Sequence, residues 1–151
     1  MGLLRRIEQG YTREEAAYSW LALSQNAKAL YLYRHAYHRT LFHSPSVDIP
    51  IDKLLRELER SLTRTLDKGW VFFDDFLAGA HIETSHQSNF NLARQGRTWR
   101  YPLPCYTEAE KSCLHNLLFG LFAEAGLVDI GHAQERMCFR VSTFGSMLFA
   151  R

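Results

Sequence analysis

The chain has 151 residues, 46% of them hydrophobic and 13% aromatic, and a formal net charge of +2. This length and composition allow a real core, so they exclude a disordered chain and predict one domain, with or without an extension. The charge is too small to indicate a partner. Of the 18 basic residues 14 are arginine, which suits phosphate pairing, although a genome-wide preference for arginine codons would produce the same bias.

The sequence indicates a cytoplasmic protein with no membrane partner. No run approaches the ~20 apolar residues of a membrane span, and the closest, Leu117 to Ala123, lies within an amphipathic pattern. The N-terminal residues lack the pattern of a secretion signal. The three cysteines, Cys105, Cys113 and Cys138, have no framework spacing and fit a reducing compartment.

The N-terminal part of the chain has the pattern of a helical arm. Thr12 and Glu15 are spaced as a capping box, in which the hydroxyl and the carboxylate satisfy free backbone N–H groups. Apolar residues then recur at helical spacing, which predicts one long helix or two in sequence over about 13–42. Pro45 and Pro50 follow and end the helical pattern.

A stripe of leucines predicts the clearest helix of the chain, over about 51–67. Gly69 follows at the position where a left-handed residue commonly ends a helix. The apolar run 70–73 predicts a short strand. Asp74 is then placed to cap a short helix over about 75–80.

Residues 84–107 differ from the rest of the chain because they contain three arginines and no Asp or Glu. We expect a long loop or an irregular arm here, with a short helix near 89–94 as the only regular element. Loops of this length are uncommon inside compact domains and are often functional.

The C-terminal part predicts a helix followed by a pair of strands. Thr107 and Glu110 form a second capping box, and the helix that they begin runs over about 108–125. Two apolar stretches, 127–130 and 137–141, predict antiparallel strands joined by a polar connection.

The last predicted element is a short helix, which Ser142 or Thr143 is placed to cap. We expect Leu58, Leu62 and Leu118 to share one core, with the strand pair at its side. The expected class is therefore α+β, mainly α.

Residues 51–149 resemble a winged helix-turn-helix domain in the order of their predicted elements. The phrase Glu-Ala-Gly-Leu-Val-Asp-Ile-Gly at 124–131, followed by Phe-Arg-Val-Ser-Thr-Phe-Gly at 139–145, is similar to the wing region of many bacterial winged helices. The resemblance implies binding of nucleic acid or docking of a protein, and no catalysis.

The resemblance also implies a division of the chain. An N-terminal helical arm covers 1–45 and a winged-helix domain covers 51–151, with a long insertion at 84–106. In the family, the helix before the wing usually carries basic or amide side chains toward bases. Here that helix has one lysine, so either recognition lies elsewhere or the fold holds proteins together.

Three groups of cations are candidate contacts for a phosphate backbone. They lie on helix 51–67, in the acid-free segment and on the strand pair. The residues expected to contact nucleic acid are Arg56, Arg60, Arg64, Arg94, Arg97, Trp99, Arg100, Arg136 and Arg140. Each group has an ordinary alternative: a solvated helix face paired with acids, aromatic anchors on the core, and charges that keep an edge strand soluble.

We found no pattern for catalysis, for a metal site or for a cofactor, because the glycines, carboxylates, histidines and cysteines are scattered. The leading hypothesis is a non-catalytic nucleic-acid-binding protein, with DNA as the expected ligand. The alternative is a protein–protein docking or dimerisation module, in which the chain pairs with a partner or with a second copy to form a homodimer.

Overall fold

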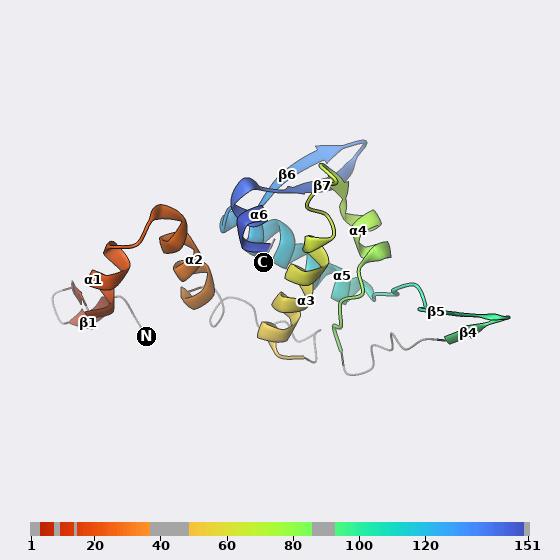
Figure 1. Ribbon diagram of the computed structural model, residues 1–151, viewed down its shortest axis with the longest axis horizontal. Coiled ribbons are helices and arrows are strands. Elements are labelled where there is room, and N and C mark those ends of the chain that lie inside the picture. The colour runs from red at the N-terminus through yellow and green to blue at the C-terminus, as the bar shows by residue number, and fades with distance from the viewer. Residues whose placement is uncertain (1–3, 8–9, 14, 37–48, 86–92, 150–151) are drawn as a thin grey trace. The chain divides into compact units, whose positions relative to one another are not determined.

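The computed structural model describes residues 4–7, 10–13, 15–36, 49–85 and 93–149 (Figure 1). The chain divides into two compact units, Met1–Phe42 and His43–Arg151. Helices predominate among the described residues, and the strands are short and antiparallel. The expected α+β, mainly helical class is confirmed.

The first unit begins with a β-hairpin that the sequence did not reveal. β1 (Leu4–Ile7) pairs with β2 (Gly10–Arg13), and the helices α1 (Glu15–Leu21) and α2 (Gln25–Ala36) follow. Thr12 lies in β2 opposite a residue of β1. The predicted capping box at Thr12 is therefore wrong, because α1 begins at Glu15 and Thr12 is not the residue that precedes its first turn.

The helical pattern over 13–42 resolves into two helices, with a break that Ser24 stabilises. The Ala27 N–H donates to Ser24 Oγ at 3.4 Å, as an N-cap requires. The indole of Trp20 donates to the carbonyl of Lys28 at 3.4 Å, and the Lys28 ammonium lies 5.5 Å from the ring centroid. The prediction beyond α2 lies outside the described residues.

In the second unit, α3 (Ile51–Thr63) buries the predicted leucine stripe. The helix ends earlier than residue 67, and the chain continues through tighter turns in which Lys68 N–H donates to the Thr65 carbonyl at 3.0 Å. Gly69 then has a φ of +67°, the left-handed conformation expected at a helix stop.

β3 (Val71–Phe72) runs directly into α4 (Phe73–Gly79). The N-cap is Phe72, in an extended conformation and without a side-chain hydrogen bond. Asp74 is therefore not the cap that we expected. It lies in the first turn of α4, where the helix dipole favours a negative charge.

The main sheet has the strand order β3-β7-β6 and is antiparallel throughout. β6 (Val128–Ala133) and β7 (Arg136–Val141) extend further than predicted and are joined by only two residues. Gln134 and Glu135 have φ values of 51° and 58°. Two positive values in a two-residue loop are the pattern of a type I′ turn, which matches the twist of paired strands.

The helix before this hairpin consists of α5 (Glu108–His115) and a π-helical segment, η1 (Asn116–Phe122). The predicted capping box of Thr107 and Glu110 is confirmed. The apolar face of the combined helix is buried, as predicted, and includes Leu118.

α6 (Thr143–Phe149) is capped by Ser142, one of the two predicted caps. Ser142 Oγ accepts the Gly145 N–H at 2.9 Å and donates to the Gly126 carbonyl at 2.6 Å. A Cβ on Gly145 would lie 2.1 Å from the Leu127 carbonyl oxygen. This contact requires a glycine and fixes the open end of the β6–β7 hairpin to α6.

The core of the second unit is lined by the leucines that the sequence indicated. Leu58, Leu62 and Leu118 are completely buried, as is Phe139 of β7. Phe76 of α4 packs edge-on against Phe139, with ring centroids 5.2 Å apart. The hairpin expected between Leu127 and Val141 is present.

Candidate nucleic-acid interface

The acid-free segment contains a hairpin, which we call the arm hairpin: β4 (Ala93–Gln95) and β5 (Thr98–Arg100). The predicted short helix is wrong for 93–94, which lie in β4, and residues 89–92 lie outside the described part. Gly96, the first residue of the turn, has a φ of +63°, as type II′ turns require. The Thr98 hydroxyl donates to the Gln95 carbonyl at 3.2 Å.

Every described side chain of the arm hairpin is exposed. Arg94 faces Trp99 across the pair, so both lie on one side of the hairpin. The exposed fraction of Trp99 is 66% and that of Tyr101, two residues further, is 59%. Trp99 is therefore not an anchor on the core, which was the ordinary alternative for it.

The sequence places no acid beside the cations of the arm hairpin. Between Glu83 and Glu108 the sequence contains no carboxylate. Within the described part of the chain, no ion pair involves Arg94, Arg97 or Arg100. Arg94 Nε donates to the Gly96 carbonyl at 3.1 Å, which leaves its charge uncompensated.

Tyr106 ties the two ends of the insertion together. Its side chain is buried, and its hydroxyl donates to the Ala80 carbonyl and accepts the Ile82 N–H at 2.9 Å. Burial raises the pKa of Tyr106, against the effect of the Ile82 hydrogen bond, and the charge of Glu110 adds to the rise. The phenol therefore stays neutral and keeps its role as donor.

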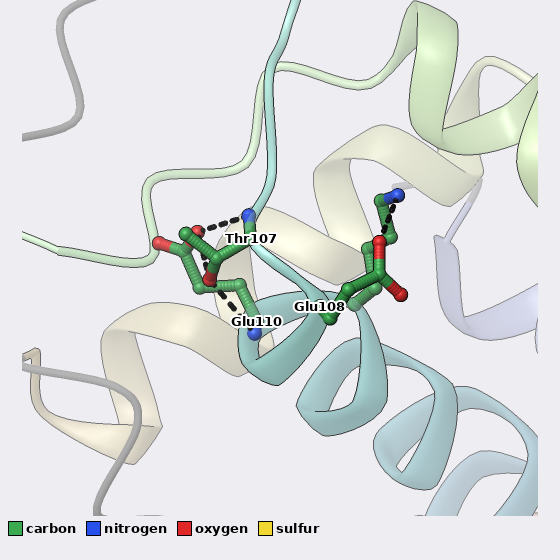
Figure 2. Close-up of polar contacts among 4 residues, drawn as sticks. Thr107, Glu108 and Glu110 are labelled. Atoms are coloured by element: carbon green, nitrogen blue, oxygen red, sulfur yellow. Dashed lines mark hydrogen bonds and ion pairs between the residues drawn. The ribbon is translucent and has the colours of Figure 1, made fainter.

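Glu110 makes a second tie at the same place. The buried Thr84 donates to Glu110 Oε1 at 2.5 Å, while the Thr107 N–H and hydroxyl each donate to Oε2 at 2.8 Å; Figure 2 shows the Thr107 contacts. Burial alone would raise the pKa of Glu110, but these hydrogen bonds lower it overall. The carboxylate is thus an ionised clamp, and with Tyr106 it fixes the base of the insertion.

On α3 the candidate arginines share their face with acids. Arg60 pairs with Glu57 at 3.2 Å, and Lys53 pairs with Glu83 at 2.8 Å. Arg56 and Arg64 are exposed and have no ion pair with a described residue. The row is therefore a mixed surface rather than a continuous line of cations.

Arg136 of β7 is committed to contacts within the fold. It pairs with Asp75 at 2.9 Å and with Asp74 at 3.5 Å, and its guanidinium lies 4.2 Å from the centroid of the Phe72 ring. The hydrogen bond to Asp75, followed by the charges of both carboxylates, raises the pKa of Arg136.

Arg140 is committed in the same way. Its Nε and Nη2 donate to Asp129 Oδ2 at 3.0 and 2.8 Å, and its guanidinium lies 5.0 Å from the centroid of the Trp70 ring. Asp129 is its direct partner in the β6–β7 register. The two arginines of this hairpin therefore balance local carboxylates.

Of the nine predicted residues, the structure brings four together on the arm hairpin: Arg94, Arg97, Trp99 and Arg100. Of the other five, Arg56 and Arg60 belong to α3, Arg64 is its C-cap, and Arg136 and Arg140 belong to the β6–β7 hairpin. Sequence reasoning missed the clamp of Tyr106 and Glu110, including the contact of Thr84 with Glu110. The only part of the clamp that the sequence indicated was the capping box that includes Glu110.

In the described ranges, no group of three or more His, Cys, Asp or Glu is placed to hold a metal ion. Over the same ranges, no helix is long and apolar enough to span a bilayer. Comparisons with families of known proteins, with curated proteins and with solved structures found no match.

Proposed function

We propose that this chain is a non-catalytic nucleic-acid-binding protein, which contacts the phosphate backbone through Arg94, Arg97 and Arg100 of the arm hairpin. The observation that carries the proposal is the exposure of these three cations in a segment without a single carboxylate. Each phosphate that they neutralise releases a condensed counterion, and this release drives binding of any sequence.

The aromatic side chains of the arm support the same proposal. Trp99 lies on the same side as Arg94 and is mostly exposed. A base stacked on an exposed indole gains about 1–3 kcal/mol, while an adjacent guanidinium is free to meet a phosphate. The clamp of Tyr106 and Glu110 presents this surface from a fixed base.

The second unit supports a winged-helix interpretation, with DNA as the expected ligand. Apart from the arm hairpin, which is inserted between α4 and α5, its elements follow the order helix, strand, helix, helix, strand pair and helix, and β3 pairs with β7. The β6–β7 hairpin would be the wing. In this interpretation the arm hairpin replaces the wing as the main basic contact, because Arg136 and Arg140 are already paired.

The test is a fluorescence-anisotropy titration of labelled 20-residue oligonucleotides, single-stranded and duplex, at several salt concentrations. The triple variant Arg94→Gln, Arg97→Gln, Arg100→Gln should lose about 10- to 100-fold in affinity at low salt. The slope of log K against log salt should fall by about 2–3, because three phosphate contacts are removed.

The matched control removes the same charge from α3. In the variant Lys53→Gln, Arg56→Gln, Arg60→Gln, two of the three cations were already paired with glutamates. We expect a much smaller loss than for the arm variant. Equal losses would show a diffuse electrostatic attraction, and no binding of either oligonucleotide by the unmodified protein at low salt would end the proposal.

A second candidate, a protein docking or dimerisation module, is favoured by apolar side chains on the same arm. Leu103 is 84% exposed and lies close to Trp99 and Tyr101 in the sequence. Tryptophan, tyrosine and arginine are enriched where interfaces carry most of their energy. Sedimentation equilibrium tests it: a concentration-dependent dimer that Leu103→Ser dissociates would support docking, and a strict monomer would contradict self-association.

A further inference from the structure

A hollow of about 170 Å³ opens where the turns after α3 meet β3 and α4. Val71, Phe76 and Gly79 supply apolar lining, and Arg64 and Lys68 line it as well. A cavity of roughly 150 Å³ holds a benzene ring. The hollow therefore has room for one small aromatic or branched aliphatic group.

The charges around the hollow are unbalanced. Arg64 and Lys68 are exposed, and neither forms an ion pair with a described residue. The one carboxylate in the lining, Asp75, is held by Arg136 at 2.9 Å. The wall of the hollow is thus almost wholly apolar, and two of the residues that line it are cations that no described carboxylate pairs with.

We propose that this hollow binds a small amphipathic anion, an aromatic or branched aliphatic group that ends in a carboxylate. The apolar part fills the space beside Val71 and Phe76, and the carboxylate pairs with Arg64 and Lys68. A guanidinium suits a carboxylate because it donates two parallel hydrogen bonds. This site is separate from the arm hairpin and does not rest on nucleic-acid binding.

The probe is 4-phenylbutyrate, titrated into the full chain labelled with ¹⁵N and followed by NMR. Its few heavy atoms limit the expected Kd to roughly 1 mM. Amide shifts should concentrate at Val71, Gly79 and Ala80. The isosteric cation 4-phenylbutylamine should bind at least about tenfold more weakly, because it meets Arg64 and Lys68 with the wrong charge.

Two pairs of variants locate the site. A Cβ on Gly79 would meet no atom within 4 Å, so Gly79→Leu has room to fill the hollow and should abolish the shifts, whereas Gly79→Ala should keep them. Arg64→Gln with Lys68→Gln should weaken binding about tenfold. Arg56→Gln, in α3 and outside the lining, should not.

The charge variants keep the test decisive even if Gly79→Leu fails to fold. Equal binding of the acid and the amine would overturn the proposal, as would full affinity in the Arg64, Lys68 double variant. A second titration uses an acetylated Glu-Phe-Glu amide as the probe. Tighter binding of this peptide would assign the site to a partner protein, and tighter binding of 4-phenylbutyrate would assign it to a free small acid.

Discussion

The β6–β7 hairpin and the arm hairpin both carry arginines, but among the described residues only those of the first pair with carboxylates, which lie on β6 and on the neighbouring α4. Arg136 and Arg140 each meet an aspartate and an aromatic ring. Arg97 and Arg100 have neither type of partner among the described residues of the arm. In one hairpin the positive charge is used within the fold, and in the other it remains available to a ligand.

The two hairpins also differ in where the fold holds them. Gly145 packs against the backbone where β6 begins, whereas the contacts of Tyr106 and Glu110 lie on residues 80–84 and 106–110, outside β4 and β5. Surface chemistry separates the two hairpins as well. A basic residue in a hairpin indicates a binding site only after its local acids have been counted.

The largest effect should come from breaking the anchor of the β6–β7 hairpin. Gly145→Ala would place a methyl group 2.1 Å from a backbone oxygen that cannot move aside cheaply, so we expect a loss of about 3 kcal/mol in the free energy of unfolding. Urea denaturation measures it. Gly120→Ala is the matched control, since its Cβ meets no atom within 4 Å, and it should cost nothing. Equal stability of the two variants would contradict the packing argument.

Removing the Glu110 contacts at the base of the insertion should lower the free energy of unfolding by less. The Glu110 carboxylate accepts from Thr84 through one oxygen and from Thr107 through the other, and Glu110→Gln leaves a single oxygen to accept from both. We therefore expect a loss of about 1–2 kcal/mol in the free energy of unfolding at pH 7. The folded pKa of Glu110 is lowered, so its contribution is present above the unfolded value of about 4.3 and is lost as the pH falls through the folded pKa.

Urea denaturation at pH 7 and at pH 3 therefore checks both the size and the sign of this effect. The gap between the unmodified protein and Glu110→Gln should shrink at the lower pH. A gap that grows on acidification would contradict the ionised clamp.

Next in size is the comparison of one arginine from each hairpin. Arg136→Gln removes the cation that pairs with both Asp74 and Asp75 and its contact with the Phe72 ring, so the melting temperature should fall by a few degrees. Arg97→Gln removes no ion pair with a described residue and should leave the melting temperature unchanged. In anisotropy titrations with a labelled oligonucleotide, Arg97→Gln should lose more affinity than Arg136→Gln. A lowered melting temperature of the Arg97 variant would contradict the contrast between the hairpins.

The smallest effect should be a gain at the turn of the β6–β7 hairpin. Gln134 and Glu135 both have positive φ values, which cost little for asparagine and glycine but more for most other residues. Gln134→Asn with Glu135→Gly should therefore raise the free energy of unfolding by about 0.5–1 kcal/mol. Thermal melting measures it, and a lowered melting temperature would mean that the turn is not of type I′.

The core could be predicted from the sequence because its signal is local and periodic. The leucines of α3 recur at helical spacing, and the capping box of Thr107 and Glu110 marks the start of α5. Ser142 was recognisable as a cap for the same reason. In contrast, β1 and β2 are short and mostly polar, and the apparent capping signal at Thr12 concealed them.

The candidate site was predictable only in part. The arm hairpin has no buried face, so its strands show no alternation of apolar and polar residues, and only Gly96 marks the turn. The neutralisation of Arg136 depends on Asp75, a residue 61 positions away in the chain. The contact between Thr84 and Glu110 spans 26 positions. Such pairings arise from tertiary structure, so no local pattern announces them.

The tie between residues 80–84 and 106–110 has a consequence for how this protein can change. Because the cost of closing the insertion is met at its two ends, the length and sequence between them enter the folding free energy only weakly. The segment between these ends can therefore change while the rest of the second unit stays the same. Residues between the two ends can therefore be replaced, by selection or by design, while Tyr106 and Glu110 keep the ends joined.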